Sequence, residues 1–192
     1  MYYIFESRIR GWGSRSLLAD SEPTIEDCEP HWWLAQPLTK RPERFKFFVP
    51  KKAKFVDNYA CGTGIDMYSR RLVELLATFP IRFEAFPADV LDEVSGEKLD
   101  VDYLAFHLLE IYPAVDFARS DLVLGPDYPS SIVAVRRLVL TEEILQAGHL
   151  LFRPAELFAF VLIHEDLKQT LDRHKITGCN YVPLGEFKVG LQ

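Results

Sequence analysis

The segment SRRLVELLATFPIRFEAFP, residues 69–87, carries the clearest structural signal in this sequence of 192 residues. Its first half holds four large apolar residues at the spacing of one helix face: Leu72, Leu75, Leu76 and Phe79. Ser69 is a typical N-cap, because its hydroxyl can accept a hydrogen bond from a free N–H of the first helical turn. Pro80 ends the helix, since proline cannot continue the hydrogen-bond pattern. The segment therefore predicts a helix over residues 69–79.

The second half of the segment predicts a strand that follows this helix directly. Residues 81–86 alternate between apolar and polar side chains, which is typical of a half-buried strand. Pro87 is expected to close this strand or to place it at a sheet edge, since proline has no N–H to donate to a neighbour. Residues 89–100 contain Ser95-Gly96 and are expected to form a turn.

Short strands and short helices follow one another irregularly along the rest of the chain. Further strands are expected at residues 1–5, 101–111, 114–118, 132–140, 149–153, 156–162 and 179–182. Further helices are expected at residues 141–147 and 163–174. Periodicity alone leaves a helix open as an alternative for residues 101–111, while residues 132–140 suit a central strand. Without regular βαβ alternation, this order predicts an α+β fold in a single domain, with a mostly antiparallel or mixed sheet and a few short helices.

The composition is that of an ordinary globular protein. Apolar residues make up 48% of the chain and charged residues 26%, which argues against disorder. The longest apolar run, residues 157–163, is far shorter than the roughly 20 residues of a membrane helix. Glu6, Arg8 and Arg10 stand where a secretory signal would need an apolar core. Because the cysteines are only three and widely spaced, they indicate reduced thiols, and the expected location is the cytoplasm.

Charge is distributed unevenly along the chain. The formal net charge is −6, which argues against a general nucleic-acid-binding protein. Residues 40–54, the basic segment, hold seven basic side chains and one acidic one, interleaved with Phe45, Phe47 and Phe48. The basic segment could contact phosphate or RNA, or it could contain a strand edge, since its aromatic residues alternate with a lysine. Residues 84–127 hold eleven acidic side chains against two basic ones, which suits either a solvated face or a docking surface for a basic partner.

Residues 58–64, with the sequence NYACGTG, resemble the glycine-rich loop of class I methyltransferases. Glycines in such loops let the backbone approach S-adenosylmethionine, and those folds place an acid for the ribose hydroxyls at about the distance of Glu84. Asn58 and Ala60 depart from that pattern, and the chain after Glu84 lacks repeated βα units. Two alternatives stay open: a methyltransferase-like enzyme that uses Cys61–Gly64, or a simple turn before the first helix.

No other motif predicts a catalytic, cofactor or metal site. His164-Glu165 begins as a zinc-protease helix does, but Lys168 stands where the second histidine ligand is required. No pair of cysteines has the Cys-x-x-Cys spacing, and the Gly-x-Ser-x-Gly motif is absent. The sequence therefore predicts neither a metal ion nor a cofactor.

A pattern that extends over nearly the whole chain is similar to a known family. Its features occur in the order 2–4, 69–79, 83–87, 103–107, 115–117, 119–120, 151–153, 157–163 and 176–183. In this order and spacing the sequence resembles a family of bacterial immunity proteins from polymorphic toxin systems, long classified as a domain of unknown function. The resemblance is strongest over residues 69–183. Residues 6–60 form a divergent, loop-rich N-terminal part, and residues 61–192 form the core that matches the family.

The resemblance implies a non-enzymatic antidote that binds and neutralises a cognate toxin by stoichiometric protein–protein interaction. A basic, nuclease-type toxin would suit the acidic charge of the chain. The contacts expected from the acidic segment are Glu93, Glu97, Asp100 and Asp102, followed by Asp116, Asp121 and Asp127. Membrane and nucleic-acid partners are not expected.

Overall fold

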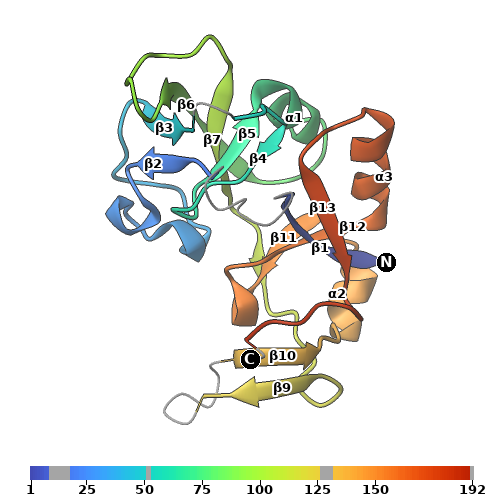
Figure 1. The fold of residues 1–192 in the computed structure, drawn as a ribbon. Coiled ribbons are helices and arrows are strands. Elements are labelled where there is room, and N and C mark those ends of the chain that lie inside the picture. Colours follow the sequence, from blue (N-terminus) through green and yellow to red (C-terminus); the bar gives the residue numbers. More distant parts are fainter. Residues whose placement is uncertain (9–17, 51–52, 126–131, 191–192) are drawn as a thin grey trace. The chain divides into compact units, whose positions relative to one another are not determined.

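The computed structural model describes residues 1–8, 18–50, 53–125 and 132–190 (Figure 1). These residues contain thirteen strands and three α-helices in mixed and antiparallel sheets, which confirms the predicted α+β class. They divide into two compact units. Unit 1 comprises Met1–Glu6, Glu110–His174 and Asn180–Gln192, and unit 2 comprises Ser7–Leu109 and Lys175–Cys179. That both units belong to a single domain stays a prediction.

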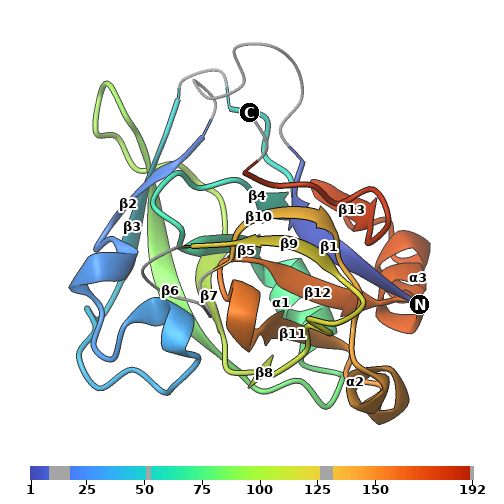
Figure 2. The same cartoon turned by 90° about the horizontal axis from the view of Figure 1, so that it is seen from below.

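Unit 2 is built on a six-stranded sheet. In spatial order the strands are β2 (Asp20–Glu22), β3 (Phe45–Val49), β6 (Phe83–Asp92), β7 (Tyr103–Leu108), β5 (Asp66–Ser69) and β4 (Asn58–Tyr59). The long strand β6 has two partners along its length (Figure 2). Phe83–Pro87 pairs antiparallel with β7, and Ala88–Asp92 pairs parallel with β3.

The prediction that Pro87 ends or edges the strand is wrong, because β6 continues to Asp92. Pro87 is the last residue of β6 in register with β7, opposite Leu104, and Ala88 is the first in register with β3. A proline lacks the N–H that a ladder would use. The free-energy cost of this missing hydrogen bond is smallest at Pro87, where β6 passes from one partner strand to the other.

The helix predicted after Ser69 is confirmed as α1 (Arg70–Leu76). The hydroxyl of Ser69 accepts a hydrogen bond from the Leu72 N–H at 3.2 Å, as an N-cap does. Leu72, Val73 and Leu76 are buried, and α1 packs against β5 and β7. The helix ends at Leu76, three residues before the predicted end, and the chain continues in tight turns towards Pro80.

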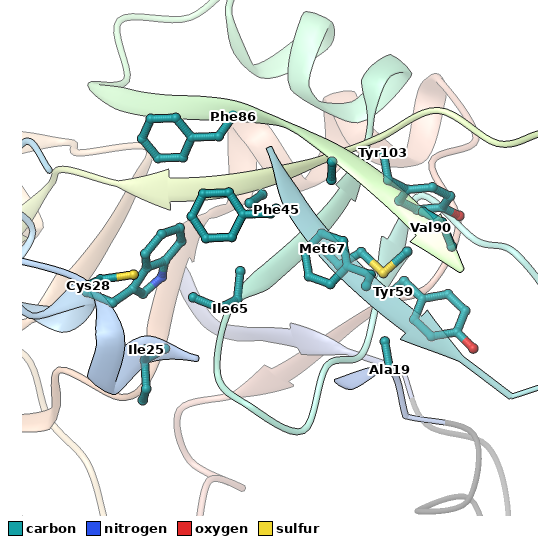
Figure 3. Close-up of a cluster of buried hydrophobic side chains, with 14 of the residues drawn as sticks. Ala19, Ile25, Cys28, Phe45, Tyr59, Ile65, Met67, Phe86, Val90 and Tyr103 are labelled. Atoms are coloured by element: carbon teal, nitrogen blue, oxygen red, sulfur yellow. The ribbon is translucent and has the colours of Figure 1, made fainter. Parts of the chain in front are cut away.

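The core of unit 2 lies between the sheet and the chain that precedes β3 (Figure 3). Residues 25–38, the covering segment, include the short 3₁₀ turns η2 (Ile25–Asp27) and η3 (Trp32–Leu34). The covering segment contributes Ile25, Cys28, Trp32 and Leu38 to this core. Phe45 of β3 packs between Trp32, at 5.8 Å between ring centroids, and Phe86, at 5.5 Å. Aromatic side chains buried in this way are among the largest contributors to stability.

Unit 1 contains a five-stranded sheet and a separate two-stranded ribbon. The sheet has the order β13 (Cys179–Pro183), β1 (Tyr2–Ser7), β12 (Val161–His164), β11 (Leu151–Pro154) and β8 (Ile111–Tyr112). The ribbon pairs β9 (Asp121–Leu124) with β10 (Ile132–Arg137). Two helices belong to this unit, α2 (Glu142–Ala147), capped by Thr141, and α3 (Glu165–Arg173), capped by His164. Among the residues that the structure describes, no helix is long and apolar enough to cross a bilayer.

Most predicted elements of unit 1 are confirmed, and three differ. Residues 114–118 do not form a strand: Val115 makes an isolated bridge with Leu140, and turns follow it. Residues 132–140 are not a central strand, because β10 ends at Arg137 and pairs with β9 in the ribbon, with Val189 bridged to Val135 on its other side. Residues 156–162 are divided between the 3₁₀ turn η4 (Ala155–Leu157) and β12. The last two stretches, residues 132–140 and 156–162, are strongly apolar. Burial of their side chains does not require that either forms one continuous strand.

One buried carboxylate ties residues 175–179 to strands β4 and β5 of unit 2. Asp57 accepts hydrogen bonds from the N–H and hydroxyl of Thr177, both at 2.8 Å, and from the hydroxyl of Ser69 at 2.7 Å. Arg71 lies 3.8 Å away. Burial alone would raise the pKa of Asp57, but the hydrogen bonds from Ser69 and Thr177 and the charge of Arg71 outweigh it and leave that pKa below its ordinary value.

We expect Asp57→Ala to lower the free energy of unfolding at pH 7 by roughly 2–4 kcal/mol, because its buried donors lose their acceptor. The folded-state pKa of Asp57 is lowered, so its stabilisation is present above the unfolded carboxyl pKa of about 3.9 and is lost as the pH falls. The difference from wild type in urea denaturation should therefore shrink below about pH 4. The exposed Asp100→Ala is the control, with an expected change below about 0.5 kcal/mol. A difference that does not depend on pH would contradict the charged role of Asp57.

Candidate functional site

The described acidic residues that are expected to bind a partner belong to two different units. Four of them are exposed and belong to unit 2. They lie in the connection between β6 and β7, the two strands that Figure 1 labels, and are Glu93, Glu97, Asp100 and Asp102. Asp116 and Asp121 belong to unit 1. Asp127 lies outside the described residues. The first four candidates therefore belong to one connection of unit 2, whereas Asp116 and Asp121 belong to the other unit.

Three of the candidates already hold counterions within the chain. Asp102 accepts two hydrogen bonds from the guanidinium of Arg70, and its hydrogen bond and charge raise the pKa of Arg70. Asp116 lies 2.6 Å from Nε of Arg119, whose hydrogen bonds lower the pKa of Asp116. Asp121 lies 3.6 Å from Arg136. These three carboxylates therefore have less charge to offer a partner than the sequence indicated.

The other three candidates in unit 2 are different. Within the described ranges no ion pair involves Glu93, Glu97 or Asp100. They lie around a tip whose backbone is held by Asp92, since Asp92 Oδ1 accepts hydrogen bonds from the N–H groups of Val94 and Ser95 at 3.0 and 2.8 Å. We refer to residues 93–100 as the acidic tip. Its excess negative charge is not compensated by the described part of the chain.

Asp89, another acid of β6, is paired with two basic side chains. Asp89 lies 2.7 Å from Nζ of Lys98 and 2.9 Å from the guanidinium of Arg44. Hydrogen bonds from Lys98 and Arg44 lower the pKa of Asp89. Although Lys98 is a residue of the acidic tip, its charge is therefore paired with Asp89 of β6 and not with Glu93, Glu97 or Asp100.

Val94 is a feature of the acidic tip that the sequence analysis missed. Its side chain is 80% exposed, although valine is normally buried. A lone apolar residue among the acids, serine and glycine of residues 92–97 was the signal that could have identified it. An exposed apolar side chain can add contact area to a protein–protein interface, in which charged side chains belong mainly to the polar rim.

The basic segment is mostly engaged within unit 2. Lys40 pairs with Glu29 at 3.0 Å, Lys46 with Glu22 at 3.5 Å, and Arg44 with Asp89. Phe45 and Phe47, which could have stacked on nucleic-acid bases, are fully buried in the core. Lys51 and Lys52 lie outside the described residues. This arrangement favours the strand interpretation of the segment over an RNA-binding surface.

The glycine-rich loop is a connection between antiparallel strands. Residues 60–65 link β4 to β5, whereas a methyltransferase loop links a strand to a helix of a parallel sheet. A Cβ on Gly64 would lie 3.1 Å from Ile25 and 3.3 Å from Trp33, so the covering segment already fills the adjacent space. The acid expected to hold a ribose, Glu84, instead accepts a hydrogen bond from the Leu38 N–H at 3.0 Å. The geometry therefore gives the methyltransferase alternative no support.

Across the residues that are described, the histidines and cysteines give no sign of a catalytic or metal-binding role. His164 caps α3, with its Nδ1 accepting from the Asp166 N–H at 3.3 Å. No disulfide joins Cys28, Cys61 and Cys179, and burial raises the pKa of Cys28 to about 11, with a further contribution from Asp27. In the portion of the chain that is described, no group of three or more His, Cys, Asp or Glu side chains is arranged to hold a metal ion.

Comparison with protein families identifies the chain's relatives. A family model described as Immunity protein family (Imm11) matches residues 5–186. This confirms the resemblance to bacterial immunity proteins, and the match includes residues 6–60, where the sequence itself showed little similarity. No curated protein matches the chain.

The glycines of the loop yield a test of its structural role. Gly64→Ala should lower the free energy of unfolding by about 1–3 kcal/mol, because the φ of +84° disfavours a side chain and the new Cβ must displace Ile25. Gly62→Ala should cost less than about 1 kcal/mol, since its Cβ would make ordinary contacts at 3.6 Å or more. Urea denaturation measures both changes. In calorimetry we expect no binding of S-adenosylmethionine, and binding to the wild type that Gly62→Val abolishes would restore the enzyme alternative.

Proposed function

Since the chain belongs to the Imm11 immunity protein family, we propose that it neutralises one cognate toxin by binding it in a stoichiometric complex, without catalysis. The observation that carries this proposal is the family match over nearly the whole chain. The internal packing of the glycine-rich loop supports it, because the loop is the feature that most favoured an enzyme and it is filled by Ile25 and Trp33.

The acidic tip is the proposed contact for the toxin. Glu93, Glu97 and Asp100 are exposed and are the predicted contacts that hold no counterion in the described part of unit 2. Carboxylates of this kind accelerate the encounter with a basic surface and select against an acidic one. Val94 would supply apolar contact area between them. A toxin whose exposed surface is basic, as in a nuclease-type domain, fits this chemistry.

Co-expression with the toxin encoded beside this protein tests the proposal directly. We expect growth to be restored and the two proteins to copurify in a fixed ratio, because inhibition by binding requires one antidote for each toxin. Titration of purified toxin with this protein should abolish toxin activity at the stoichiometric point and no earlier. Loss of toxin activity at a small fraction of that ratio would indicate a catalytic mechanism and contradict the proposal.

Charge reversal at the acidic tip tests the proposed contact. The triple variant Glu93→Lys, Glu97→Lys, Asp100→Lys should slow association with the toxin by about tenfold or more at low salt and should flatten its salt dependence. Val94→Ser should act differently and accelerate dissociation, since it removes contact area rather than charge. Surface plasmon resonance at several salt concentrations separates the two effects.

The control for the triple variant changes the net charge by the same amount at three exposed glutamates elsewhere: Glu26, Glu143 and Glu186. Replacing these by lysine should alter association far less than the change at the acidic tip does. Equal slowing by both triple variants would mean that overall charge, not the acidic tip, attracts the toxin. Unchanged kinetics in the tip variant would place the contact elsewhere while leaving the antidote function intact.

A further inference from the structure

A fully buried histidine lies in the core of unit 2. His107 of β7 has no exposed surface and stands directly opposite Glu84 of β6 in the antiparallel register. Its ring packs against the indole of Trp32, with 4.4 Å between ring centroids. A buried ionisable side chain costs free energy unless hydrogen bonds compensate it, so its partners decide its charge.

Both ring nitrogens of His107 face oxygen atoms. Nε2 lies 2.8 Å from the main-chain oxygen of Trp32, and Nδ1 lies 3.3 Å from Oε2 of Glu84. A carbonyl oxygen can only accept, and so can an ionised carboxylate. A neutral imidazole carries one N–H and therefore satisfies one of these two oxygens, whereas an imidazolium satisfies both.

Glu84 connects the same pair to a second point of the covering segment. Its Oε2 accepts a hydrogen bond from the N–H of Leu38 at 3.0 Å. The His107–Glu84 pair therefore holds the carbonyl of Trp32 at one end and the N–H of Leu38 at the other. Between these two points the chain has no regular structure beyond the 3₁₀ turn η3.

These two hydrogen bonds hold the main chain of the covering segment at points that the packing of its apolar side chains does not hold. The indole N–H of Trp32 is buried and has no hydrogen-bond partner in the described part of the chain. The ring of Trp32 is thus held by packing, and its main chain is held by His107. Leu38 is 8% exposed and its N–H relies on Glu84.

We propose that His107 is an imidazolium in the folded protein and that the Glu84–His107 pair is a proton-dependent clasp that holds residues 32–38 against the sheet. With the proton present, both nitrogens donate and the carboxylate is paired with a positive charge. When the proton is lost, the lone pair of Nδ1 faces the carboxylate of Glu84. The ring then repels the carboxylate that accepts from Leu38, so the attachment at Leu38 weakens while Nε2 still donates to the carbonyl of Trp32.

Two neighbouring elements present groups to His107. Strand β6 presents the carboxylate of Glu84, and the 3₁₀ turn η3 presents the ring and carbonyl of Trp32. On the other side of β7, the residues of β5 that share this core are apolar, as Met67 is. The guanidinium of Arg41 lies 4.7 Å from the ring centroid of Phe86, which itself packs near Trp32.

The protonation state of His107 can be measured in the wild-type protein by nitrogen NMR of its ring. At pH 7.5 an unperturbed histidine is mostly neutral, so two protonated ring nitrogens on His107 are the expected and diagnostic result. A neutral ring with one protonated nitrogen at that pH would overturn the proposal, whatever any variant does.

Hydrogen exchange tests the clasp itself. As the pH rises through the titration of His107, exchange of the Leu38 amide should accelerate by about tenfold beyond the intrinsic base-catalysed increase. The amides of β7 that pair with β6 serve as the internal reference, and they should follow the intrinsic increase alone. Equal behaviour of Leu38 and the reference amides would show that the pair does not hold the segment.

A charge-removing variant separates the ion pair from the packing. In Glu84→Gln the amide oxygen can still accept from Leu38, but the negative charge is gone, so His107 should be neutral at pH 7.5. Glu43→Gln removes the same charge from an exposed residue of the same unit and should leave His107 protonated. If Glu84→Gln does not fold, the wild-type NMR and exchange results still decide the proposal. An unchanged His107 in a folded Glu84→Gln variant would contradict it.

Discussion

The pairing of strand β6 with two different partners is the constraint on which unit 2 depends. Its first half is antiparallel to β7 and its second half is parallel to β3. A parallel pair cannot be joined by a hairpin, so the chain between β3 and β6 must make a long connection. That connection contains β4, β5 and α1, and it places β5 on the far side of β7. The order of the sheet therefore follows from one strand.

Buried polar pairs secure the parts of unit 2 that regular structure does not reach. Asp57 holds residues 175–179 through Thr177, and the His107–Glu84 pair holds the covering segment through Trp32 and Leu38. In both places a charged side chain accepts or donates several hydrogen bonds at once. Such bonds are stronger than neutral ones, and they specify one position for a segment that apolar packing alone would leave free to slide.

The ion pairs in the structure reduce the number of acidic residues that are available to a partner, which the amino-acid composition alone could not do. The sequence presents one long acidic stretch, but Asp89 and Asp102 form ion pairs with lysine and arginine side chains of the same unit. In the described part of unit 2, Glu93, Glu97 and Asp100 are exposed and appear in no ion pair, and Val94 is exposed among them. An interaction surface of this kind combines charge, which governs association, with apolar area, which governs residence time.

Features that depend on neighbouring residues could be derived from the amino-acid sequence alone. Ser69 and Thr141 mark the starts of α1 and α2, because an N-cap bonds to an N–H only a few residues away. Alternation within a few residues likewise identified the first half of β6 and offered the strand interpretation of β3. The order and spacing of short motifs along the chain were enough to indicate the immunity protein family.

The pairing of strands and the partners of charged side chains could be established only from contacts between distant segments. The ion pair of Asp102 with Arg70 and the bonds of His107 to Trp32 join residues 32 and 75 positions apart. The continuation of β6 beyond Pro87 likewise depends on β3, which lies far away in the chain. Local patterns cannot specify such contacts, because the free energy that selects them arises only when distant segments exclude water together.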